Sequence, residues 1–104
     1  MTVHLLKCWP APFAALRSGA KKHEVRKDDR AFAVGDVLRL DEWRPRREPN
    51  FYDGQYQEVF QADRGEYTGE RLWMRVTYKS EAGTWGLPAN LCVLSVEPCD
   101  VVTP

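Results

Sequence analysis

The chain has 104 residues, enough for one domain with a modest core and too few for two. Fifteen basic and fifteen acidic residues give a formal net charge of zero, so the overall charge does not indicate a nucleic-acid partner. No apolar run approaches the roughly 20 residues of a membrane-spanning helix, and the N-terminal stretch has no uninterrupted apolar segment typical of a secretory signal.

The first elements are short. Residues 3–8 are apolar and bounded by Pro10, which predicts a strand. Phe13 and Leu16 give one face of a brief helix, and Gly19 is a good residue to end it. A helix of this length depends on packing for its stability.

Alternation and turn residues organise the next stretch. Residues 22–26 are predicted to form a strand, and residues 27–30 a polar turn. A second turn is indicated at Gly35-Asp36. Residues 37–43 then alternate well, with leucines on one face and polar side chains on the other, which predicts another strand.

The stretch from residue 44 to residue 69 carries two prolines and three glycines and is predicted to be irregular. Within it, residues 55–61 fit a short strand or a short helix, and the pattern does not decide between them. A structureless loop of this length is unusual in a small domain. It would be either a functional flap or a segment that is ordered on its own.

The C-terminal part contains the strongest strand pattern, at residues 71–79. Leu72, Met74, Val76 and Tyr78 are predicted to line one face of it, and Trp73, Arg75 and Thr77 the other. A second apolar strand follows at 91–97, after a connection rich in glycine at 82–90, and 101–104 is expected to be a tail. The order of elements predicts an α+β, mostly β fold: a small mixed β-barrel or half-barrel of five or six strands with one or two short helices.

The cysteines and histidines indicate structural roles. Three cysteines, at positions 8, 92 and 99, have no metal-ligand spacing, and Cys8 and Cys92 lie in apolar runs where a buried thiol is expected. Unpaired thiols fit a reducing, cytoplasmic compartment. His4 and His23 are expected to be packed or half-exposed strand residues, and we predict no metal site and no cofactor.

Charges are unevenly distributed along the chain. Residues 17–47 contain ten basic and six acidic side chains, whereas residues 48–104 contain four basic and nine acidic ones. The short basic cluster 44–47 could contact phosphates, or it could be a solvated loop. Aromatic residues beside loops, such as Tyr67, could stack on bases or fill the open end of a small barrel.

The most informative residues for function follow the helix. In a strand, Lys22, Glu24 and Arg26 share one face, close to Lys21 at the preceding turn. An arginine fork suits phosphate or a base edge, and the carboxylate could accept from an amine or hold the arginine. The alternative is a structural Glu–Arg pair with Lys21 in solvent.

Several blocks together resemble the pattern of ASCH domains, members of the PUA-like superfamily, and especially a family of uncharacterised ASCH-related bacterial and phage proteins. The blocks are Ser18-Gly19-Ala20-Lys21, Glu24-Val25-Arg26-Lys27-Asp28-Asp29-Arg30, Gly35-Asp36, Tyr67-Thr68-Gly69 and Val76-Thr77-Tyr78. The likeness spans roughly residues 3–97 and treats 44–69 as a variable insertion in a single domain, 1–104.

The resemblance implies a PUA-like barrel that binds RNA or a nucleotide-like ligand after the first helix. The predicted binding residues are Lys21, Lys22, Glu24, Arg26, Lys27, Arg30 and Tyr67. Some ASCH proteins are small hydrolases that use a lysine and a threonine three residues later, but here Glu24 takes the place of that threonine. One alternative is a small hydrolase, an amidohydrolase or ribonuclease, that acts on a modified nucleoside or RNA with Lys21 and Glu24 as catalytic candidates. Another is a phage-type protein-interaction factor that uses residues 44–69. A monomer is the default expectation.

Overall fold

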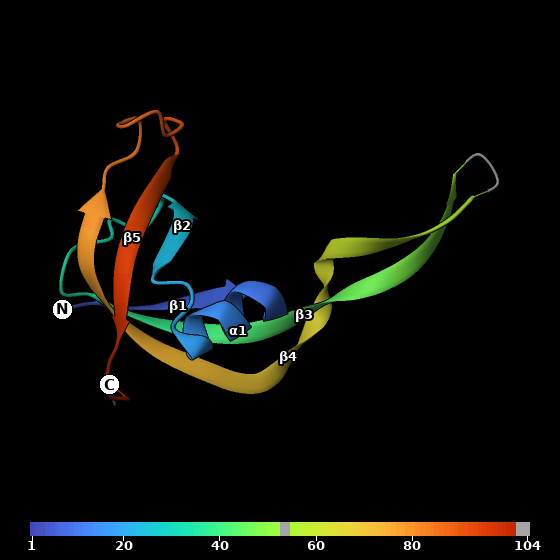
Figure 1. The fold of residues 1–104 in the computed structure, drawn as a ribbon, viewed down its shortest axis with the longest axis horizontal. Coiled ribbons are helices and arrows are strands. Elements are labelled where there is room, and N and C mark those ends of the chain that lie inside the picture. The colour runs from blue at the N-terminus through green and yellow to red at the C-terminus, as the bar shows by residue number, and fades with distance from the viewer. Residues whose placement is uncertain (53–54, 102–104) are drawn as a thin grey trace.

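Five strands and one helix make up the described chain (Figure 1). The computed structural model describes residues 1–52 and 55–101, with side chains over 1–47 and 64–101. In order, the elements are β1 (Val3–Cys8), α1 (Pro10–Ser18), β2 (His23–Lys27), β3 (Val37–Tyr52), β4 (Gln55–Ser80) and β5 (Leu91–Pro98).

The strands form one mixed sheet in the order β1-β3-β4-β5-β2. β1 runs parallel to β3, with Val3 opposite Val37, and the other neighbours are antiparallel. The predicted α+β, mostly β fold is confirmed, with one helix in the described residues. The sheet is open: β1 and β2 are its edges, and in the described part of the chain no strand pairing joins them into the predicted barrel.

The N-terminal elements follow the local sequence signals. β1 has the predicted bounds, and α1 begins directly after Trp9 with a proline in its first turn. The helix ends at Gly19, whose φ of 83° is a left-handed conformation that glycine adopts without strain. The Gly19 N–H donates to the Leu16 carbonyl at 3.2 Å and closes the last turn.

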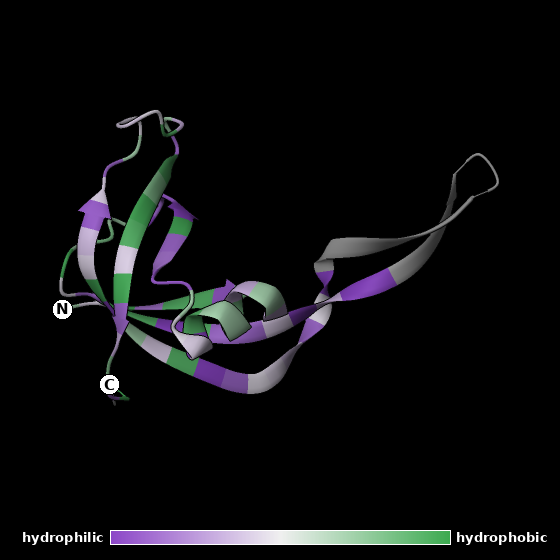
Figure 2. Ribbon diagram, in the orientation of Figure 1, coloured by the Kyte–Doolittle hydropathy of each residue, from purple (hydrophilic) through white to green (hydrophobic). Residues whose placement is uncertain are grey.

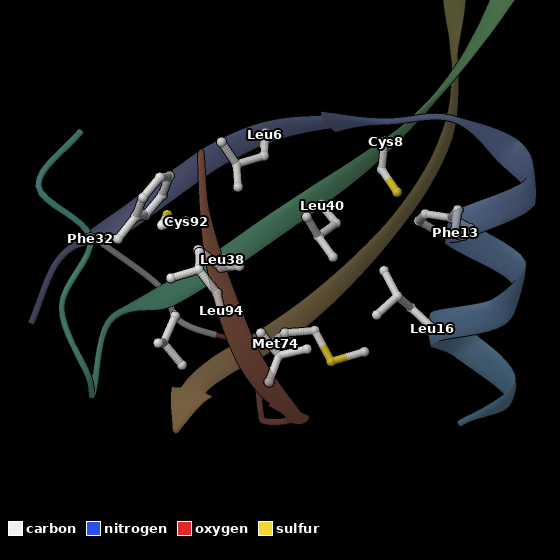
Figure 3. Close-up of a cluster of buried hydrophobic side chains, with 12 residues drawn as sticks. Leu6, Cys8, Phe13, Leu16, Phe32, Leu38, Leu40, Met74, Cys92 and Leu94 are labelled. Atoms are coloured by element: carbon white, nitrogen blue, oxygen red, sulfur yellow. The ribbon is translucent and has the colours of Figure 1, made fainter. Parts of the chain in front are cut away.

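The core lies where the concave side of the sheet meets α1. Phe13 and Leu16 point from the helix toward Leu40 and Met74, as Figure 3 shows. These side chains are at most 3% exposed, so each adds roughly 1.5–3 kcal/mol of apolar burial. Figure 2, coloured by hydropathy, shows that the hydrophobic residues are gathered in the body of the molecule.

The prediction that residues 44–69 form an irregular loop is wrong for the described residues. β3 and β4 continue past β1 as a two-stranded arm, in which residues 43–52 pair with residues 55–67 (Figure 1). The undecided segment 55–61 is strand. Because this arm projects from the body, the radius of gyration is 15.8 Å, against about 13 Å for a compact domain of this length.

The residues that suggested a loop mark β-bulges in this arm. Pairing shifts register between Pro45 and Arg46, opposite Gly65 and Gln61, so β4 carries extra residues there. Proline, which cannot donate a ladder hydrogen bond, is tolerated at such a site. A second shift lies opposite Gly69, which has a φ of 92°, so the Tyr67-Thr68-Gly69 block forms a bulge inside β4.

A third register shift changes the face of the last residues of β4. Pairing with β5 shifts between Val76 and Tyr78. Tyr78, predicted to share a strand face with Met74 and Val76, lies beyond this bulge and is 61% exposed, whereas those two side chains are buried. Lys79 instead has a side chain that is only 11% exposed, and its Nζ donates to Asp28 Oδ1 at 3.0 Å.

Candidate functional site

Lys21, Glu24 and Arg26, called the trio below, come together as predicted from strand alternation. Lys21 Nζ donates to Glu24 Oε1 at 3.1 Å, and Arg26 Nε donates to Glu24 Oε2 at 3.0 Å. The Glu24 side chain is 4% exposed, whereas those of Lys21 and Arg26 are 26% and 22% exposed. The buried carboxylate is thus held between two half-buried cations.

The trio follows from the way the chain leaves α1. After the left-handed Gly19, the Lys21 N–H donates to the Ala15 carbonyl at 3.0 Å, which turns the chain back toward the sheet. β2 then alternates, so Glu24 faces inward while His23 and Val25 face solvent.

Two arginines bridge the open edges of the sheet. Arg26 Nη2 donates to the Lys7 carbonyl at 2.9 Å, and Arg30 Nη1 donates to the Leu5 carbonyl at 2.8 Å. Both carbonyls belong to β1, the opposite edge from β2. The guanidinium groups therefore satisfy edge acceptors that a neighbouring strand would otherwise pair with.

The other predicted binding residues lie apart from the trio or are engaged differently. Lys22 and Lys27 are exposed at the two ends of β2. The Arg30 guanidinium binds β1 and lies 3.8 Å from the Asp29 carboxylate. Tyr67 is on β4, 60% exposed, at the start of the arm.

Cys8, at the end of β1, lies close to the trio. It is buried, as predicted, and burial raises the pKa of its thiol to about 11, with the Glu24 carboxylate raising it further. Such a thiol stays protonated and inert near neutral pH. Cys92 is also buried, all three cysteines are free, and no three His, Cys, Asp or Glu side chains of the described residues gather to hold a metal ion.

The trio's groups are engaged with one another. Both Glu24 oxygens accept hydrogen bonds from the Lys21 ammonium and the Arg26 guanidinium, so acid–base catalysis or ligand binding there would first have to open these ion pairs. Neither of the two pockets described below is lined by these three residues. The predicted roles of the trio in binding and in hydrolysis stay predictions.

The larger of two pockets in the described part of the chain is a groove between the start of α1 and the base of the arm, with a volume of about 1220 Å³. We call it the arginine groove. It is lined by Trp9, Pro10, Ala11, Pro12, Arg44, Pro45, Arg46, Arg47, Arg64, Gly65 and Glu66. It thus combines the predicted basic cluster 44–47 with a fourth arginine from β4 and a tryptophan from the end of β1.

The cations of this groove differ in what they contact. Arg44 and Arg64 are exposed, and no hydrogen bond or ion pair within the described residues engages their side chains. Trp9 is 39% exposed, and its ring lies 6.4 Å from the buried ring of Trp43, over which the Lys7 ammonium sits at 3.9 Å. A flat aromatic ring and available guanidinium groups therefore share one concave surface.

Gly65 sets the shape of the groove floor. A Cβ at this position would overlap the Arg44 carbonyl oxygen and approach Trp43 Cζ2 to 2.6 Å. The two strands can therefore come this close only where β4 has no side chain. The glycine that sequence reasoning counted as a loop signal is required by close backbone packing.

A second, smaller pocket of about 390 Å³ lies over β1, β3 and β4 and includes Tyr67. Its central carboxylate is neutralised, because Asp41 accepts two hydrogen bonds from Arg39, at 3.1 and 2.9 Å, and lies 3.4 Å from Arg71. The bidentate pair leaves little charge for a ligand. This pocket is the weaker candidate.

The Gly35-Asp36 block stabilises the turn before β3 through hydrogen bonds to the Asp36 carboxylate. Asp36 Oδ2 lies 2.8 Å from His4 Nε2 and accepts from the Ala33 N–H at 3.0 Å, and both ring and carboxylate are buried. Burial alone would raise the pKa of Asp36, but hydrogen bonds from His4, Thr2 and Ala33 outweigh it and lower that pKa below its usual value. His4 is a packed strand residue, as predicted.

The fold and the two pockets define a small α+β domain with a projecting arm and a basic, aromatic groove. The family described as "Domain of unknown function (DUF3850)" matches residues 3–96, and the chain belongs to this family. No curated protein matches the chain. Among the described residues, no helix has the length and apolar character to cross a membrane.

Proposed function

We propose that this protein is an RNA-binding module that takes a single-stranded segment in the arginine groove. The observation that carries the proposal is the placement of Arg44 and Arg64, both exposed and without an ion pair in the described residues, beside the half-exposed ring of Trp9. Proteins bind single strands by combining cations for the backbone with aromatic rings for the bases.

The chemistry of the groove suits both parts of a nucleotide. Guanidinium groups bind phosphate oxygens with two donors at once. Trp9 and three proline rings offer apolar faces on which a base can lie. Because the whole chain has no net charge, affinity must come from this local cluster and not from a long-range field.

The finer kinship is part of the proposal. We infer that the chain is an ASCH-type, PUA-like domain, supported by the ordered blocks around Gly19, Glu24 and Gly35. Further support comes from Arg26 of β2 and Arg30 of the turn after it, which both donate to carbonyls of β1. In a PUA-like barrel these edges would meet. A reducing, cytoplasmic setting is proposed from the three free thiols.

The test is fluorescence anisotropy with a labelled single-stranded RNA at several salt concentrations. Replacing Arg44 and Arg64 together by alanine should weaken binding about tenfold and reduce the slope of log K against log salt by about 1.4, since each phosphate contact contributes about 0.7. Arg17→Ala is the matched control, because Arg17 is also exposed but lies outside the groove. Binding that is undetectable, or equal in the double variant, would overturn the proposal.

A further inference from the structure

The connection between β4 and β5 presents one tryptophan fully to solvent. Trp85 is 90% exposed, the highest value among the large hydrophobic side chains that are described as exposed. From Ala82 to Asn90 the loop contains no charged residue, so its tip is entirely neutral. An isolated exposed leucine is ordinary, but a tryptophan held in water is typical of a recognition site.

Hydrogen bonds hold this loop, residues 81–90, in one shape. The Thr84 hydroxyl donates to the Glu81 carbonyl at 2.6 Å, the Leu87 N–H donates to the Thr84 carbonyl at 2.8 Å, and the Gly83 N–H donates to the Pro88 carbonyl at 3.0 Å. Two tight turns therefore lie one after the other. The loop displays its tryptophan with little freedom left to lose on binding.

The base of the loop is anchored as well. Lys79 Nζ lies 3.0 Å from Asp28 and 3.4 Å from Glu81, and the Asp28 N–H donates to the Asn90 carbonyl at 2.9 Å. Trp85 itself has a φ of 53°, an uncommon backbone conformation for a residue with a side chain. Strained backbone of this kind is found where the surrounding structure has a use for it.

The arginine groove has the chemistry to receive such a tip. Its apolar lining comes from Trp9 and three prolines, and the guanidinium groups of Arg44 and Arg64 can lie over an indole ring. Because the loop around Trp85 carries no cation, it would not be repelled by these arginines. For the same reason, the loop has no cation with which to bind a phosphate backbone itself. With no net charge on the chain, two copies are not kept apart by general repulsion.

We propose that Trp85 docks into the arginine groove of a second copy of this chain. Figure 1 shows the loop between β4 and β5 at the top of the body and the arm extending to the side, so the donor and acceptor surfaces lie on different parts of the molecule. The contact is therefore heterologous, and it extends into rings or chains of copies. RNA, in the proposed function, would compete with Trp85 for the same groove.

The test is sedimentation velocity over a wide range of protein concentration. The wild type should form species larger than a dimer as concentration rises, and Trp85→Ala should weaken this association roughly thirtyfold, as for an interface hot spot. Tyr78→Ala is the matched control, an exposed aromatic residue outside the loop and the groove, and it should associate like the wild type.

A complementation arm identifies the acceptor. Trp85→Ala keeps the groove, and a variant with Arg44→Glu and Arg64→Glu keeps the tryptophan, so neither should self-associate, but their mixture should form one-to-one dimers. Far-UV circular dichroism checks that both fold. A wild type that stays monomeric, equal association of Trp85→Ala, or an unreactive mixture would overturn the proposal. Trp85→Ala binds RNA at least as tightly as the wild type if the proposed function holds, because it removes only the competitor for the groove, so failures of the two proposals are distinguishable.

Discussion

Removing the Glu24 carboxylate should be among the most damaging single changes outside the apolar core. Glu24→Ala leaves the Lys21 ammonium and the Arg26 guanidinium next to each other without their shared anion. It also removes the hydrogen bond from Arg26 to Glu24 that orients the guanidinium toward the Lys7 carbonyl. The loss therefore affects both the trio and the bridge between the sheet edges.

The size of the effect can be worked from the exposed fractions. Breaking a fully buried ion pair costs about 3–5 kcal/mol. Because the Lys21 and Arg26 side chains are 26% and 22% exposed, water compensates them in part, and we expect about 2–3 kcal/mol. For a domain of this size that corresponds to a fall in Tm of roughly 8–24 °C.

Urea unfolding followed by circular dichroism measures this difference. Glu70→Ala is the matched control: Glu70 also pairs with an arginine, at 3.4 Å from Arg17, but both side chains are more than half exposed, so the loss should stay under about 0.5 kcal/mol. Glu24→Gln, which keeps an acceptor and loses the charge, should fall between the two. If Glu24→Ala were no more destabilising than the Glu70 control, the structural role of the trio would be refuted.

Three further predictions concern other parts of the fold. Gly65→Ala places a Cβ 2.6 Å from the Trp43 indole and should cost about 1–3 kcal/mol in urea unfolding; an unchanged midpoint would show that the arm base is not tightly packed. Asp36, whose pKa is lowered by folding, stabilises the protein above its usual pKa of 3.8, and this stabilisation is lost as pH falls through the folded pKa. Asp36→Asn and wild type should therefore differ most near neutral pH and converge in acid, and a pH-independent difference would contradict this. Burial raises the pKa of the Cys8 thiol to about 11, so alkylation of the native protein should reach the half-buried Cys99 first, and mass spectrometry showing equal rates would exclude the buried geometry.

Local patterns predicted the elements whose signals are local. The apolar run of β1, the stop at Gly19 and the alternation of residues 37–43 all depend on near neighbours in sequence, and each is where the pattern placed it. The trio was also predictable, because alternation alone puts Glu24 and Arg26 on one face of a strand.

The arm could not be predicted in this way. Pro45, Gly65 and Gly69 are turn signals in a local window, but here they occupy bulges in two long paired strands. Whether a glycine ends a strand or forms a bulge within it depends on how the partner strand pairs with it. That pairing is set by residues far away in the sequence. The same holds for Tyr78, which a bulge turns away from the core.

The candidate site shows the same division. The basic cluster 44–47 is recognisable in the sequence as a run of charged residues. That Arg64 lines the same groove depends on the register shift between Pro45 and Arg46, which the sequence does not reveal. Likewise, no sequence signal indicates that Arg26 and Arg30 reach carbonyls of β1, 19 and 25 residues earlier in the chain. Trp9 was missed as a groove residue because it follows a strand and precedes prolines, a position that a turn explains equally well.

The most direct test of the arginine groove is an NMR titration of isotope-labelled protein with a single-stranded RNA. The four tryptophans give four indole N–H signals, one of them from Trp9. Binding in the groove predicts that the Trp9 signal and the amides of Arg44 and Arg64 shift together. Shifts confined to residues 21–30 would place the ligand at the trio instead, and they would contradict the account.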